Sequence, residues 1–195
     1  QNFRITPTES LYGLGQFQDG VMDYRGQELL LAQSNQIAIV PFVLSTNQYG
    51  LLWNLYSKSR FAEKQNCMSF QTSYKEALEY YFIAGDTPDQ VISGYRPLTG
   101  KAPMFPKTAF GFWQSKERYT SFEELHQVVD GYRKRNLPID NIVQDWQYWG
   151  DNSMWSAMYF EPFHFPNPAN NIDKLHSQHI KLMCSVWPAT GSRTH

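Results

Sequence analysis

The chain has 195 residues, a length typical of one large domain or of one small domain with part of another. Hydrophobic residues make up 42% of the chain and charged residues 18%, which excludes a chain that is disordered throughout. The formal net charge is -1, so the chain has no single-sign field of the kind that holds a polyanion. We therefore expect neither nucleic acid nor a membrane surface as a partner.

Residues 1–98 are predicted to form an antiparallel β-sandwich domain. Short apolar or alternating runs separated by polar turn residues are typical of antiparallel strands. These runs are residues 29–31, 37–40, 43–44, 50–53 and 78–84. The segment Gly13-Leu14-Gly15 precedes them, lacks the third glycine of a dinucleotide-binding pattern, and is interpreted as a turn.

A short connector helix is predicted towards the end of this domain. Asp86 or Thr87 can serve as its N-cap, and Pro88 suits its first turn. Residues 99–106 are then rich in glycine and proline and are interpreted as a linker.

Residues 99–195 alternate between strand and helix patterns, which predicts a parallel sheet with right-handed crossovers. The strand candidates are residues 109–113, 141–146 and 181–187, and the helix candidates are residues 121–135 and 168–178. Ser121 followed by Glu124 is typical of a capping box. The chain from Lys107 onward is much shorter than the ~250 residues of a complete (β/α)8 TIM barrel, so only three strands of such a barrel fit.

The densest cluster of candidate functional residues is Gln144–Asp151, at the end of the second strand candidate. In a barrel this end of the sheet is the active-site face, so the Asp145 carboxylate is expected to point at substrate. Three aromatic rings within four positions suit a hydroxyl-rich ligand, because a carboxylate can accept two sugar hydroxyls between apolar walls. The alternative is that Asp145 caps the following loop.

Two further tryptophans, Trp113 and Trp187, lie on the first and third strand candidates. We expect them at the same relative height, near the end that carries Asp145, where they would line an aromatic pocket. Each ring could instead fill the core.

Metal and cofactor sites find no support in the sequence. His176 and His179 have no matching carboxylate or thiol partner and are expected at the surface. Cys67 and Cys184 are too far apart for a metal-ligand pair or a disulfide framework, and they assign no cellular compartment. The longest apolar run, residues 37–44, is far shorter than the ~20 residues of a membrane span. We expect no metal ion and no cofactor.

Four segments resemble, in order and spacing, glycoside hydrolase family 31, the family of α-glucosidases and α-xylosidases. They are residues 9–16, 110–115, 132–149 and 181–188. The resemblance implies an N-terminal β-sandwich followed by a (β/α)8 barrel, and a retaining mechanism on α-linked sugars. Such a mechanism needs two carboxyl groups ~5 Å apart. In this family both are aspartates beyond the third barrel strand, so we expect the 195-residue segment to lack them and to be inactive alone.

The resemblance also implies roles for particular residues. Asp145 matches the aspartate that binds hydroxyls of the terminal sugar, and Trp146 matches the neighbouring wall of the pocket. Thr190 and Trp187 are further substrate-binding candidates. In the loop after the first strand, where some relatives have a pocket aromatic, this sequence offers Glu117 between Lys116 and Arg118.

The form Asp-Trp-Gln-Tyr-Trp at residues 145–149 resembles the α-xylosidases more than the glucosidase branch, which has Asp-Ile-Asp-Tyr-Met. We expect Trp146 to crowd a hydroxymethyl group and to spare a pentose, so α-xylosides are the expected substrates and α-glucosides the alternative. The alternative from a different class of protein is a non-catalytic carbohydrate-binding or structural module. The expected partners are an oligosaccharide and, through the open barrel edge, a second copy of the chain. We expect both ends to be cut points within a longer protein.

Overall fold

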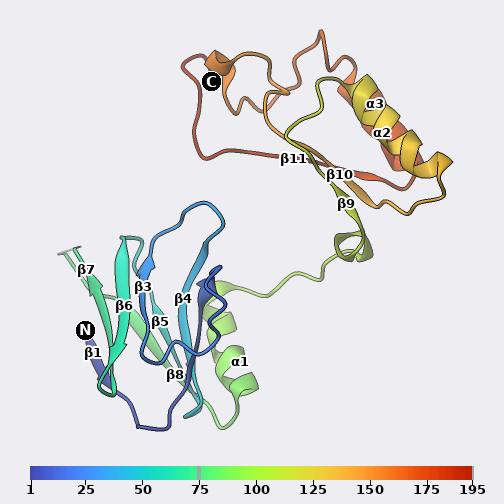
Figure 1. Ribbon diagram of the computed structural model, residues 1–195. Coiled ribbons are helices and arrows are strands. Elements are labelled where there is room, and N and C mark those ends of the chain that lie inside the picture. The colour runs from blue at the N-terminus through green and yellow to red at the C-terminus, as the bar shows by residue number, and fades with distance from the viewer. Residues whose placement is uncertain (74–75, 195) are drawn as a thin grey trace. The chain divides into compact units, whose positions relative to one another are not determined.

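The computed structural model describes residues 1–73 and 76–194, which form two units, Gln1–Pro103 and Met104–His195. The first unit contains two antiparallel four-stranded sheets (Figure 1). In spatial order the first sheet consists of β1 (Asn2–Arg4), β7 (Cys67–Thr72), β6 (Ser59–Lys64) and β3 (Glu28–Leu31). The second consists of β2 (Leu11–Gln16), β4 (Ala38–Ser45), β5 (Tyr49–Trp53) and β8 (Tyr80–Ala84). The predicted antiparallel, sandwich-like architecture is therefore confirmed.

The core of this unit consists of side chains from both sheets. Because successive residues of a strand point to opposite faces, alternate residues of β5 and β7 enter the core. The largest buried side chains are Leu11, Leu14, Leu51, Trp53, Phe61, Met68 and Phe70. The Trp53 ring stacks on Phe70 with a centroid distance of 5.0 Å, and its Nε1 donates to Ser59 Oγ at 3.0 Å.

The segment Gly13-Leu14-Gly15 is part of strand β2, so its interpretation as a turn is wrong. The pairing of β2 with β4 shifts register between Gly13 and Gly15, which is a β-bulge. Both glycines have positive φ, +107° and +115°, which a side chain would disfavour. A Cβ at Gly15 would also lie 2.0 Å from the Ala38 carbonyl oxygen, so only glycine permits this close approach.

Helix α1 (Pro88–Thr99) begins as predicted, since the Thr87 side chain accepts a hydrogen bond from Gln90 N at 3.2 Å. It is more than the short connector that the sequence suggested. Its Val91 side chain is fully buried against Phe42 and Leu52, on the face of the second sheet that points away from the main core (Figure 1). The helix therefore closes a second, smaller core.

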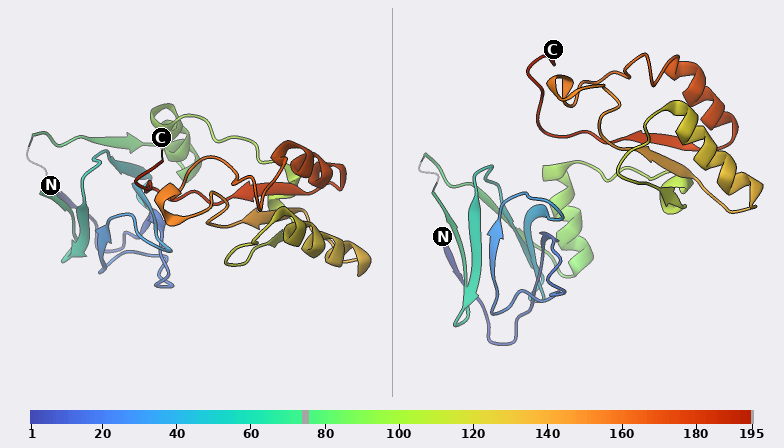
Figure 2. Two further views of the ribbon diagram at one scale, coloured as in Figure 1. Left: turned by 90° about the horizontal axis from the view of Figure 1, so that it is seen from above. Right: turned by 45° about the horizontal axis from the view of Figure 1, so that its top comes forward.

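The second unit contains a three-stranded parallel sheet in the order β11 (Lys181–Cys184), β10 (Asn141–Gln144), β9 (Trp113–Gln114). Helices α2 (Phe122–Lys134) and α3 (Pro168–Ser177) connect the strands and lie side by side on one face of the sheet (Figure 2). The buried side chains between helices and sheet include Leu125, Val129, Ile142, Leu175 and Ile180. The predicted alternation of strands and helices is confirmed.

The first strand of this sheet is shorter than predicted. Residues Lys107–Phe110 form the 3-10 helix η1 instead, and only Trp113 and Gln114 pair with β10. Trp113 Nε1 donates to the Ala109 carbonyl at 3.1 Å, and Asn141 Nδ2 donates to the Thr108 carbonyl at 2.7 Å. The start of the apolar run is therefore part of a 3-10 helix next to the amino end of the sheet.

The structure shows where the histidines and cysteines considered as metal ligands lie. His176 and His179 are exposed, as expected. Cys67 and Cys184 are free thiols. Among residues 1–73 and 76–194, no group of three or more His, Cys, Asp or Glu side chains could hold a metal ion. In that same part of the chain, no helix has the length and hydrophobicity needed to span a membrane.

A buried carboxylate, Glu9, joins the start of β2 to the turn between β4 and β5. Only 2% of the residue is exposed. One carboxylate oxygen accepts from Ser45 Oγ at 2.6 Å and from the Tyr49 hydroxyl, and the other accepts from Thr6 N and Asn47 Nδ2, both at 2.9 Å. Burial acts to raise the pKa of Glu9, but these hydrogen bonds outweigh it and leave the pKa below 4.5.

We expect Glu9→Gln to destabilise the first unit by ~1–3 kcal/mol, because an amide cannot accept all of these hydrogen bonds. Since the folded-state pKa is lowered, the stabilisation by Glu9 is complete above about pH 4.5 and is lost as the pH falls through the folded-state pKa. Glu9→Gln should remove this pH dependence. Urea denaturation at several pH values measures both effects.

The matched control is Glu28→Gln, because Glu28 makes only exposed ion pairs with Arg60 and Lys64. Exposed pairs of this kind contribute ~1 kcal/mol or less. Equal destabilisation by the two substitutions would contradict the role assigned to Glu9.

Candidate functional site

The candidate site lies at the carboxyl end of the parallel sheet. Gln144 of β10 pairs with Cys184 of β11, and the Ser185 amide continues the pairing by donating to the Gln144 carbonyl at 2.9 Å. Because the strands are parallel, the segments that follow them leave the sheet at the same edge. Asp145 follows β10 at this edge and Trp187 follows β11.

Asp145 is half-buried directly after the last residue of β10. Its Oδ1 accepts a hydrogen bond from the backbone amide of Trp146 at 2.8 Å. Its other oxygen receives no hydrogen bond from the part of the chain that the structure describes. An ionised carboxylate can accept several hydrogen bonds, so this oxygen is available to a ligand with hydroxyl groups.

Four tryptophans, Trp146, Trp149, Trp155 and Trp187, form a cluster beside Asp145. Trp155 is at its centre, with ring centroids 5.4 Å from Trp146, 5.7 Å from Trp149 and 5.3 Å from Trp187. Trp149 is fully buried, whereas 46% of Trp187 is exposed. The cluster therefore has a buried base and an exposed edge that can stack on a ligand.

The segment after β11 is held against the segment that contains Trp155. Trp187 N donates to Ser156 Oγ at 3.1 Å, and Gly191 N donates to the Trp155 carbonyl at 3.0 Å. Thr194 Oγ1 donates to the same carbonyl at 3.0 Å. These bonds fix where Trp187 lies relative to Trp155.

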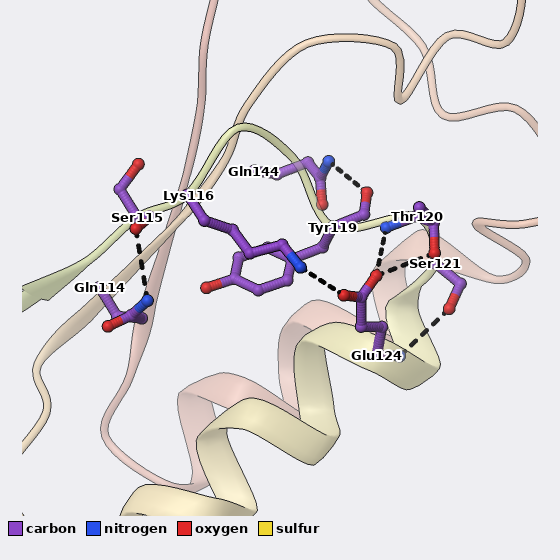
Figure 3. A network of polar contacts seen from close by, with 8 residues as sticks. All are labelled: Gln114, Ser115, Lys116, Tyr119, Thr120, Ser121, Glu124 and Gln144. Carbon is purple, nitrogen blue, oxygen red and sulfur yellow. Dashed lines mark hydrogen bonds and ion pairs between the residues drawn. The ribbon is translucent and has the colours of Figure 1, made fainter.

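The loop between β9 and α2 is held by a polar network around Glu124 (Figure 3). The Glu124 carboxylate accepts from Lys116 Nζ at 2.6 Å and from both the amide and the hydroxyl of Thr120, at 2.6 and 2.8 Å. The hydrogen bond from Lys116, together with those from Thr120, lowers the pKa of Glu124 to about 2. Glu124 therefore stays ionised, and the loop stays tied to the helix, well into the acidic range.

The capping box at the start of α2 is present in a modified form. Ser121 Oγ accepts from Glu124 N at 3.1 Å, as predicted. In the reciprocal bond, the Glu124 carboxylate accepts from the Thr120 amide rather than from that of Ser121.

Gln144 connects this loop to the strand that carries Asp145. Its side chain is fully buried, and Nε2 donates to the Tyr119 carbonyl at 2.9 Å (Figure 3). The same Nε2 also donates to the Asp145 carbonyl at 3.0 Å. The loop also brings the Arg118 guanidinium to 5.9 Å from the Trp146 ring centroid, a cation–π contact.

Three of the predicted site residues, Asp145, Trp146 and Trp187, come together at this edge of the sheet. Glu117 is exposed on the loop after β9, and Thr190 is exposed on the segment after β11. The structure places both on segments that leave the same edge of the sheet.

Two expectations about the aromatic residues are wrong. Trp113 pairs with Asn141 at the first position of β10, so it lies at the end of the sheet opposite to Asp145. Tyr148 and Trp149 are buried, 3% and 0% exposed, and pack with Phe122 and Phe165 in a core. Of the three rings that follow Asp145, only Trp146 is available as a pocket wall.

Trp155 and Ser156 were not predicted as site residues, and Arg118 was noted only as a neighbour of Glu117. Trp155 belongs to a segment whose only regular structure is the 3-10 helix η2 (Asn152–Met154), so no periodicity marks it. The available signal was compositional, because four of the six tryptophans fall after residue 140.

The chain can be compared with known proteins. Residues 102–195 match the family described as Glycosyl hydrolases family 31 TIM-barrel domain. The whole chain is 40% identical to an alpha-xylosidase from Saccharolobus solfataricus and spans 28% of that protein. It is 35% identical, over 98% of its length, to an uncharacterized family 31 glucosidase from Pseudescherichia vulneris, of which it spans 36%.

Solved structures also resemble this chain. A GH31 alpha-xylosidase from a soil metagenome, complexed with xylose, superposes on all of this chain with a TM-score of 0.88 and 37% identity, and the chain spans 28% of it. A xylosidase from Aspergillus niger superposes on 99% of this chain with a TM-score of 0.86 and 26% identity, and the chain spans 27% of it. The chain thus spans about a third or less of each of these relatives.

At Gly191 the segment after β11 passes close to the backbone of Ser153 and Trp155. A Cβ there would lie 2.3 Å from the Ser153 carbonyl oxygen and 2.5 Å from Trp155 N. We expect Gly191→Ala to push this segment away and to increase the solvent accessibility of Trp155 and Trp187. Acrylamide quenching of tryptophan fluorescence should therefore rise in the folded variant.

The control is Gly131→Ala on α2, where the nearest atom to a Cβ is the flexible end of Arg135 at 3.3 Å. It should stabilise the helix by up to ~1 kcal/mol and leave the quenching unchanged. Unchanged quenching in Gly191→Ala would show that the segment after β11 does not shield these rings.

Proposed function

Because the chain belongs to glycosyl hydrolase family 31, we propose that it is part of a retaining α-glycosidase that hydrolyses terminal α-xylosides. Two relatives described above carry α-xylosidase in their names, and a third is called a xylosidase. The chain spans about a third or less of each, so the activity belongs to a longer protein. Within residues 1–195 we assign substrate binding and no catalytic carboxylate.

The observation that carries this proposal is the half-buried Asp145 with one oxygen open beside the tryptophan cluster. A sugar offers hydroxyl groups at its edge and apolar C–H groups on its face. A carboxylate suits the hydroxyls, and the exposed edge of Trp187 suits the face. We assign Asp145, Trp146 and Trp187 to the pocket of the terminal sugar, with Thr190 and Glu117 at its rim.

We further propose that β9, β10 and β11 are the first three strands of a (β/α)8 barrel. Helices α2 and α3 cover one face of this sheet, and Met183 on the other face is 49% exposed. The outer strands β9 and β11 have backbone groups free to pair, and closure of a barrel would satisfy them. Further strands of the same barrel are the proposed cover for this face, and a second copy of the chain is the alternative.

The preference for xylose rests on Trp146. Xylose is a pentose and lacks the hydroxymethyl group that glucose carries at C5. The indole of Trp146 follows Asp145 directly and contacts both the Trp155 ring and the Arg118 guanidinium. A ring held by two neighbours cannot move aside easily, so it leaves little room for a larger sugar.

Asp145→Ala tests the site. Two charge-assisted hydrogen bonds at ~1.5–3 kcal/mol each predict a loss of about 3–6 kcal/mol of transition-state stabilisation, that is, at least a hundredfold in kcat/KM. The measurement is hydrolysis of an aryl α-xyloside by the complete protein. Asp173→Ala, at an exposed carboxylate of α3, should leave kcat/KM unchanged. If Asp145→Ala keeps near-normal kcat/KM, Asp145 only caps its loop.

Trp146→Ile tests the specificity. The smaller side chain should relieve crowding and narrow the preference for aryl α-xylosides over aryl α-glucosides by about ten- to hundredfold, since such pocket contacts are worth ~1–3 kcal/mol. The ratio of the two kcat/KM values is the measurement, with the melting temperature as a check of folding. Equal kcat/KM values of the unsubstituted protein for the two aryl glycosides would refute the proposed preference for α-xylosides.

A further inference from the structure

The first unit has a groove of about 620 Å³ away from its main core. Strands β3, β4, β5 and β8, the loop after β5 and helix α1 all contribute to its wall. Its volume falls within the ~300–1,000 Å³ typical of ligand sites in proteins. The residues used below are Asn54, Tyr56, Lys58, Tyr81 and Tyr95.

Three tyrosines line this groove, and two of them are exposed. Tyr56 is fully exposed, with a relative accessibility of 103%, and Tyr81 is 38% exposed. Tyr95 of α1 is fixed by its contact with Phe42, with ring centroids 4.4 Å apart. A tyrosine that packs against nothing does not stabilise the fold, but it presents an apolar ring face and a hydroxyl to a ligand.

The polar groups of the groove are held in place by Glu79. Its Oε1 accepts from Asn54 Nδ2 at 2.8 Å and from the Tyr81 hydroxyl. Because Glu79 already receives the Asn54 amide hydrogen, the Asn54 side-chain oxygen is directed elsewhere and can accept from a ligand. Lys58 adds a donor and is the only charged residue among those that line the groove.

We propose that this groove binds a neutral oligosaccharide. Its wall combines apolar surfaces and tyrosine rings with hydroxyl and amide groups, and linked sugars likewise combine apolar faces with hydroxyl edges. A single lysine provides too little charge to select an anionic ligand. An apolar helix in the groove would leave the polar tips without partners, so a sugar chain fits better than a protein segment.

The choice of a sugar rests in part on the proposed function, whereas the groove does not. A glycosidase that binds a sugar chain at a second point raises the local concentration of that chain. Small aryl glycosides are too short to use such a site. The groove should therefore affect oligosaccharides and not aryl substrates.

The test measures binding of cellotetraose and of maltotetraose to the complete protein by calorimetry, in an Asp145→Ala background so that the sugar pocket contributes little. We expect at least one of the two to bind and Tyr56→Ala to weaken it at least tenfold. Tyr56→Phe, which keeps the ring, should change the affinity less than threefold. Met22→Ala, at a 77% exposed side chain that does not line the groove, is the control.

The proposal is overturned if neither tetrasaccharide binds, or if Tyr56→Ala binds as tightly as its parent. Its failure is distinguishable from that of the proposed function. In the otherwise unsubstituted protein, Tyr56→Ala should leave hydrolysis of an aryl α-xyloside unchanged. Absence of that hydrolysis together with Tyr56-dependent binding would retain the groove and reject the glycosidase.

Discussion

The parallel pairing of β10 with a strand on either side is the constraint on which the candidate site depends. The pairing is in register from Asn141 with Lys181 to Gln144 with Cys184, and the Ser185 amide extends it. A slip of β11 by one residue would turn Leu182 away from the helices and expose it. Because Leu175 of α3 and Ile180 are fully buried against this sheet, helix packing resists such a slip. The core thus sets the positions of the two strand ends after which Asp145 and Trp187 follow.

The loops themselves are ordered mainly by aromatic contacts. Between β10 and α3 the only regular structure is the short η2, so few ladder or helix hydrogen bonds hold this segment. Trp155 instead contacts three other tryptophans, and Phe122 contacts Phe160 and Phe165. Each such pair contributes ~0.5–1.5 kcal/mol beyond area burial. Rings assigned to the proposed sugar pocket therefore also stabilise the loop.

Local signals made part of the fold predictable. Helix α2 was predicted to within one residue at each end, because Ser121 caps it and Leu125 and Val129 lie on one face. Strand β6 was missed because Ser59 and Glu63, rather than apolar residues, alternate inward with Phe61. Buried polar residues with tertiary partners remove the periodic signal. The apolar run at residues 109–113 predicted a full strand, but Lys107–Phe110 form the 3-10 helix η1, and within the run only Trp113 pairs with β10.

The location of the candidate site could be predicted from the order of the strands, because residues that follow parallel strands lie at one edge of the sheet. The contribution of Trp155 to the site could not be predicted, because its position depends on the path of a loop. The two interpretations of Asp145 left open by the sequence are compatible. Oδ1 caps the Trp146 amide, and this bond fixes the carboxylate so that the other oxygen points to a defined place. A group already fixed by the fold loses less entropy when a ligand binds. The capping bond is therefore compatible with the proposed role of Asp145 as a sugar ligand and is not evidence against that role.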